Sequence, residues 1–106
     1  MPAKDTVFSL VVVIVNQGYS EEVIRIAQES GAGGGTIMFG RGASLRSKAT
    51  LLGISIEPQK EVIYVVSPQD IVPELLQKLN QACSLDEPGA GLAFALPLDA
   101  VTGLDL

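Results

Sequence analysis

An apolar run at residues 7–15 constrains the fold of this chain more than any other feature. The run is rich in β-branched residues and is closed by the turn-forming residues 16–18, so it predicts a strand. Its positions are apolar in succession rather than in alternation, which is typical of a strand that is buried on both faces. Residues 61–66 predict another strand of this kind, which is apolar at each of positions 62–66. The chain therefore needs a sheet whose inner strands are covered on both sides.

Two segments show helical spacing instead. Residues 19–30 predict a helix with Ser20 as its N-cap, because apolar residues recur there at positions 23, 26 and 27. A second helix is expected after Asp70, which can cap it, with Pro73 in the first turn. Its buried face is predicted from one apolar stripe, formed by Val72, Leu75, Leu76, Leu79 and Cys83.

The remaining segments complete the order of elements. Residues 36–39 and 92–96 predict two further strands, and the Gly40-Arg41-Gly42 sequence is expected to break the first of them. Residues 43–60 are expected to form a loop with a helical turn at 44–52. The resulting order is β-α-β-β-α-β, which predicts an α+β, ferredoxin-like split sandwich with a four-stranded antiparallel sheet and two helices on one face. Because the other sheet face also needs cover, we expect a homo-oligomer.

Composition excludes several classes of function. The chain has no His and one Cys, so it lacks the residues of most zinc sites and of His-dependent nucleophilic catalysis. Its carboxylates show no paired spacing, and we therefore expect no enzymatic activity. Aromatic residues make up 5% of the chain, which is poor for stacking nucleic-acid bases. The apolar runs are shorter than the ~20 residues that span a bilayer, and the N-terminal segment does not fit a signal peptide, so a cytoplasmic protein without membrane insertion is expected.

The charge is distributed unevenly along the chain. The net charge is −5, but positions 41–60 carry Arg41, Arg46, Lys48 and Lys60 against Glu57 alone. A local basic segment on an acidic chain favours an anionic ligand or partner at that place. The alternative is a solvated loop that carries a few basic side chains.

Two glycine-rich segments are candidate binding loops. Gly40-Arg41-Gly42 follows one predicted strand, and Pro88-Gly89-Ala90-Gly91 precedes another. Glycines allow backbone N–H groups to converge on a phosphate, and a guanidinium fixed between glycines suits a phosphate or a carboxylate. Neither segment has the GxxxxGK[ST] pattern of a Walker A loop. Plain turn chemistry is the alternative for each loop taken singly.

These loops and the order of the elements resemble the P-II signal-transduction (nitrogen regulatory) proteins, in particular their divergent P-II-like branch. The residues that carry the resemblance are Gly31-Ala-Gly-Gly-Gly-Thr-Ile37, similar to GVxGMTV, Phe39-Gly40-Arg41, similar to FGR, Gly89-Ala-Gly-Leu-Ala-Phe94, similar to GDGKIF, and Leu96-Pro-Leu98, similar to LPV. The resemblance covers nearly the whole chain and implies a single P-II-like domain over residues 1–106. It also implies a homotrimer that binds adenine nucleotides between its subunits.

The resemblance assigns roles to particular residues. It implies ligand-binding residues at Gly40, Arg41, Gly42, Gly89 and Gly91. Residues 42–59 would form a short T-loop that contacts a target protein such as a membrane transporter, through Leu45, Arg46, Lys48, Leu51 and Leu52. The family's B-loop lysine is Leu92 here, which favours a ligand with less charge than a triphosphate.

Two other interpretations remain open. An assembly or scaffold protein of the same fold would bind no small molecule, and its loop leucines would fold back or form oligomer contacts. The CutA-like copper-tolerance proteins are a related trimeric family, but the absence of His disfavours a metal role.

Overall fold

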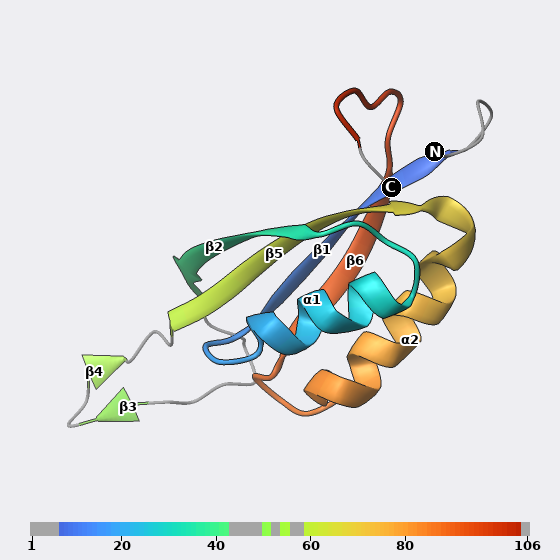
Figure 1. Ribbon diagram of the computed structural model, residues 1–106. Coiled ribbons are helices and arrows are strands. Elements are labelled where there is room, and N and C mark those ends of the chain that lie inside the picture. Colours follow the sequence, from blue (N-terminus) through green and yellow to red (C-terminus); the bar gives the residue numbers. More distant parts are fainter. Residues whose placement is uncertain (1–6, 43–49, 52–53, 56–58, 105–106) are drawn as a thin grey trace.

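Two helices cover one face of a four-stranded antiparallel sheet (Figure 1). The computed structural model describes residues 7–42, 50–51, 54–55 and 59–104. The main elements are β1 (Phe8–Asn16), α1 (Ser20–Glu29), β2 (Gly35–Arg41), β5 (Gln59–Pro68), α2 (Val72–Cys83) and β6 (Gly91–Pro97). A short 3-10 turn, η1 (Gln69–Ile71), leads into α2, and β3 (Thr50–Leu51) pairs with β4 (Ile54–Ser55). The predicted ferredoxin-like βαββαβ fold is confirmed.

The two apolar runs form the inner strands of the sheet, as their patterning predicts. The strand order is β2-β5-β1-β6, so β1 and β5 lie inside and β2 and β6 lie at the edges. In the register, Val11 of β1 lies opposite Val65 of β5 on one side and Ala95 of β6 on the other. Every described sheet pairing is antiparallel, which brings alternating strand ends together at each end of the sheet.

The core lies between the sheet and the helices. Alternate residues of β1 and β5 face the helices, as the period of two requires. The helices meet them with apolar stripes that recur every three to four residues. The core residues are Val11, Val13, Val15, Val23, Ile26, Ala27, Ala32, Ile63, Val65, Leu75, Leu79 and Cys83. Burial also raises the pKa of the Cys83 thiol, which fits its predicted role as a small core residue.

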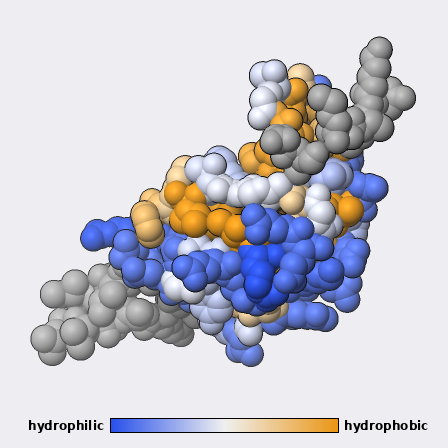
Figure 2. All heavy atoms as spheres, in the orientation of Figure 1, coloured by the Kyte–Doolittle hydropathy of each residue, from blue (hydrophilic) through white to orange (hydrophobic). Residues whose placement is uncertain are grey.

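The opposite face of the sheet, which we call the open face, carries large apolar side chains, and no described helix or strand covers it. The register places Tyr64, Leu92, Phe94 and Leu96 on this face, and each of them is exposed. The helical side is more polar: Figure 2 shows hydrophilic residues gathered over the helices, with a hydrophobic band beside them along the sheet. The exposed apolar side chains of the open face lie along β5 and β6.

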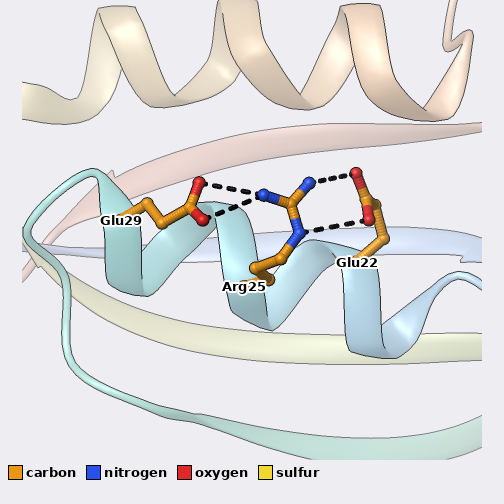
Figure 3. A network of polar contacts seen from close by, with 3 residues as sticks. All are labelled: Glu22, Arg25 and Glu29. Atoms are coloured by element: carbon orange, nitrogen blue, oxygen red, sulfur yellow. Dashed lines mark hydrogen bonds and ion pairs between the residues drawn. The ribbon is translucent and has the colours of Figure 1, made fainter.

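The outer surface of α1 carries a small ion network (Figure 3). Arg25 lies one turn from both Glu22 and Glu29, and its guanidinium nitrogens lie 2.5 Å and 2.9 Å from their carboxylate oxygens. Both acids raise the pKa of Arg25. The three side chains are exposed, so this network favours helix formation locally and contributes little to the stability of the whole fold.

Several local predictions are wrong, each for a physical reason. Gly40 and Arg41 do not break the strand, because they pair with Lys60 and Gln59 and extend β2 to its end. Asp70 lies in the 3-10 turn, and the N-terminus of α2 has no side-chain cap. The helical turn expected at 44–52 is contradicted at residues 50–51, which form β3; the other residues of that prediction lie outside the described ranges.

The N-cap predicted for α1 is also wrong. Ser20 is the first helical residue, and no side chain of the preceding residue caps the helix. The Gly18 N–H instead donates to Oε1 of Glu61, a residue of β5. The Ser20 hydroxyl and backbone N–H groups of this turn lower the pKa of the Glu61 carboxyl. A buried carboxylate from a distant strand therefore satisfies the positive end of this helix.

This arrangement predicts an acid-sensitive contribution to stability. Because the folded-state pKa of Glu61 is lowered, its stabilising effect is present above the unfolded-state pKa and is lost as the pH falls through the folded value. We expect Glu61→Gln to reduce the free energy of unfolding at pH 7 by about 1–2 kcal/mol. The difference from the unsubstituted protein should shrink as the pH falls below about 4.5, measured by urea unfolding across that range. A constant difference at all pH values would mean that the Glu61 charge is not involved.

Candidate functional site

A cavity of about 520 Å³ lies at one end of the sheet. It is lined by residues from the ends of four strands and from the loop before β6, namely Ile14, Gly40, Arg41, Gly42, Lys60, Val62, Gly89, Gly91 and Leu92. The structure therefore brings together Gly40, Arg41, Gly42, Gly89 and Gly91, which the sequence predicts as ligand-binding residues. The cavity lies within the volume range of small-molecule sites.

The antiparallel topology explains why these distant segments meet. β1 and β2 finish at the end of the sheet where the cavity lies, whereas β5 and β6 begin there. Lys60 lies opposite Asn16 of β1 on one side and Gly40 of β2 on the other. Leu92 lies opposite Ile14 in the adjoining pair of strands.

The cavity has an apolar part and a cationic part. Ile14, Val62 and Leu92 contribute apolar side chains from the open face of the sheet. Arg41 and Lys60 bring positive charge, and the two glycine-rich segments bring accessible backbone. This combination suits a ligand with a flat apolar group and an anionic group.

Lys60 is the functional candidate that sequence reasoning did not single out. Its side chain is buried, with 8% of the residue exposed. Its Nζ donates to Oδ1 of Asn16 at 2.5 Å and to the carbonyl oxygen of Gly89 at 3.1 Å. The Asn16 amide also donates to the Gly89 carbonyl at 3.2 Å. The available signal was a lysine two positions before the apolar residues 62–66, which from the sequence alone is one of the basic residues at 41–60.

Glycine is required for steric reasons at the start of β6 but not at Gly40 of β2. Gly89 and Gly91 have φ values of +76° and +135°. A Cβ at Gly91 would lie 2.0 Å from the carbonyl oxygen of Ile14, so only glycine fits there. A Cβ at Gly40 would meet only the Val62 side chain at 3.9 Å, an ordinary contact distance. The β6 side of the cavity is therefore the sterically constrained side.

The predicted partner-binding residues lie mostly outside the described part of the chain. This is the case for Leu45, Arg46, Lys48 and Leu52. Leu51 lies in β3, where it pairs with Ile54 of β4. Figure 1 shows this hairpin beyond the ends of β2 and β5, at the end of the sheet where the cavity lies.

Two further features bear on the class of site. Within the described ranges, no cluster of three or more His, Cys, Asp or Glu side chains could hold a metal ion. No helix in the same part of the chain has the length and apolar character needed to cross a membrane.

Comparisons with known proteins place this chain among ferredoxin-like structures. No protein-family model matches the sequence. Mouse Matrilin-1 is 30% identical over 80 residues, which are 76% of this chain and 16% of Matrilin-1. The chain thus spans only a small part of that relative.

Two solved structures share the fold. A Bacillus cereus protein related to NIF3 superimposes with a TM-score of 0.71 at 20% identity, over 94% of this chain and 28% of that one. The GlnK–ATP complex of Bacillus subtilis superimposes with a TM-score of 0.68 at 15% identity, over 88% of this chain and 85% of that one. At these identities the likeness shows a common fold, and GlnK is a P-II protein of nearly matching extent.

Proposed function

We propose that residues 1–106 form one P-II-like regulatory domain without enzymatic activity. It binds a small anionic effector, an adenine nucleotide, in the cavity at the end of the sheet, where β2, β5, β1 and β6 all contribute to the lining. It then signals through loop 42–59 to a partner protein such as a membrane transporter. The observation that carries this proposal is the convergence of Arg41 and both glycine-rich segments on one cavity.

The shape and charge of the cavity support a nucleotide as the effector. A nucleobase can lie against Ile14, Val62 and Leu92, while a phosphate meets Arg41 and the backbone of Gly89 and Gly91. The similarity of fold to a P-II protein solved as an ATP complex supports an adenine base. Leu92 in place of a lysine favours a ligand with fewer charges than a free triphosphate.

The open face supports a homo-oligomer, which we propose to be a trimer. Its exposed apolar residues continue from the cavity, since Leu92 lines the cavity and lies in the same strand as Phe94 and Leu96. A second subunit on this face would remove these side chains from water and add a wall to the cavity. In this arrangement the ligand lies between subunits.

The proposal predicts that Arg41→Ala weakens nucleotide binding by about tenfold or more, because a charge-assisted hydrogen bond is lost. Binding of AMP, ADP, ATP and cyclic AMP, with and without Mg²⁺, would be screened by thermal shift and measured by calorimetry. Arg25→Ala is the matched control, since it removes the same charge from the exposed surface of α1. Equal affinity in the two variants would remove Arg41 from the site.

The second candidate function is an assembly or scaffold protein that binds no small molecule. The apolar open face favours it, because that face can hold an oligomer together without a ligand. If no nucleotide shifts the melting temperature of an intact oligomer, this second function is supported and the first is contradicted.

A further inference from the structure

We infer that Lys60 binds the phosphate group of the ligand and supplies the buried positive charge of the site. This inference rests on the proposed function and deepens it by naming the residue and the chemical class, a nucleoside phosphate with a dianionic group. It starts from Lys60, whose role the fold alone does not explain.

A buried ammonium is costly unless its charge is compensated. The described acceptors of Lys60 are the Asn16 amide oxygen and the Gly89 carbonyl oxygen, and both are neutral. The neighbouring acid, Glu61, does not provide the compensation. Successive side chains of a strand point to opposite faces, and Glu61 binds the N-terminal turn of α1 on the helical face. Among the described ion pairs, none involves Lys60.

The ammonium is also placed to receive an anion. An ammonium has three N–H donors, and Asn16 and Gly89 accept two of them. Lys60 lines the cavity, and within the described part of the chain no acceptor takes its remaining donor. The two hydrogen bonds hold Nζ in one place before the ligand arrives, which lowers the entropic cost of binding.

The charge of the cavity indicates which anion fits. Arg41 and Lys60 are its cationic lining residues, and the described lining contains no carboxylate. Two positive charges match one phosphate dianion, as carried by a nucleoside monophosphate, better than a free triphosphate. Lys60 thus provides from β5 the charge that Leu92 does not provide from β6.

The test compares two probes that differ only in phosphate, AMP and adenosine. We expect Lys60→Met to weaken AMP binding by about 10- to 100-fold and to leave adenosine binding within about twofold. AMP would be measured by calorimetry and adenosine by NMR titration, with the fold checked by circular dichroism. Lys78→Met is the matched control, because Lys78 is an exposed lysine on α2. It should leave both affinities unchanged.

The outcomes separate this inference from the proposed function. Unchanged AMP affinity in Lys60→Met, together with weakened affinity in Arg41→Ala, overturns the role of Lys60 and leaves the proposed function standing. An equal loss for AMP and adenosine makes Lys60 a structural residue and also overturns the inference. If the unsubstituted protein binds none of AMP, ADP, ATP and cyclic AMP, the proposed function fails and the inference fails with it. If it binds another of these nucleotides but not AMP, the inference alone is overturned.

A measurement on the unsubstituted protein covers the case in which Lys60→Met does not fold. The ammonium resonance of Lys60 would be followed by ¹⁵N-selective NMR during titration. It should shift on addition of AMP and stay in place on addition of adenosine, while the Lys78 signal stays in place with both. If the Lys60 ammonium resonance does not shift at saturating AMP, the inference is overturned.

Discussion

Gly91→Ala is expected to destabilise the protein by about 3 kcal/mol or more and to lower its melting temperature by roughly 12 °C or more. The φ angle of Gly91 is +135°, a conformation that residues with a Cβ rarely adopt. The added Cβ would also lie 2.0 Å from the Ile14 carbonyl oxygen, so the first rungs of the β1–β6 pairing must separate. Thermal unfolding followed by circular dichroism measures the change.

Gly40→Ala provides the comparison for this substitution. Gly40 also lines the cavity, but its Cβ would meet only a side-chain methyl at 3.9 Å. We expect the melting temperature of Gly40→Ala to stay close to that of the unsubstituted protein. Similar melting temperatures for the two variants would contradict the close approach of Gly91 to β1.

Phe94→Asp is expected to dissociate the proposed homotrimer. Phe94 lies in the middle of β6 on the open face, opposite Val12 of β1. An aspartate there would place an unpaired charge in the subunit interface, at a cost of about 3–5 kcal/mol, which corresponds to a dissociation constant raised about 100-fold or more. Analytical ultracentrifugation over a concentration series would measure the change in assembly.

Val101→Asp is a closely matched control for Phe94→Asp. Both residues are 38% exposed in the single chain, but Val101 lies outside the sheet, in the C-terminal segment. Its substitution should leave the oligomer intact. An oligomer that persists in Phe94→Asp at low concentration would show that the open face is not the interface.

The sequence predicts the fold where local pattern and tertiary environment agree. The β-branched segments at 7–15 and 61–66 form β1 and β5. Residues that are apolar at successive positions of a strand are buried on both faces only when the strand lies inside a sheet. The two helices followed from their apolar stripes within a residue or two of the expected ends. The glycine-rich segments and Arg41 were candidates for ligand binding, from their residue types and from a family resemblance, and the topology places them on one cavity.

The remaining features depend on contacts between distant segments, which local patterns do not contain. The helix N-terminus at Ser20 is stabilised by Glu61, 43 positions away from Gly18 in the chain. Gly40 remains in a strand because β5 offers it a pairing partner, although glycine disfavours strands locally. In the sequence, Lys60 is one basic residue among several. Only the folded chain brings Asn16 and Gly89 within hydrogen-bond distance of its ammonium group.

The adjacent pair Lys60 and Glu61 has a consequence for how β5 finds its place in the sheet. Each of the two side chains finds its hydrogen-bond partners on one face only, Lys60 beside Asn16 and Glu61 at the start of α1. A slip of β5 by one position would exchange the faces, placing the ammonium against the positive end of a helix and the carboxylate in the cavity. Both charges would then lose their partners at once. The pair therefore favours one pairing register of β5. In that register the positive charge of Lys60 faces the cavity and the negative charge of Glu61 does not.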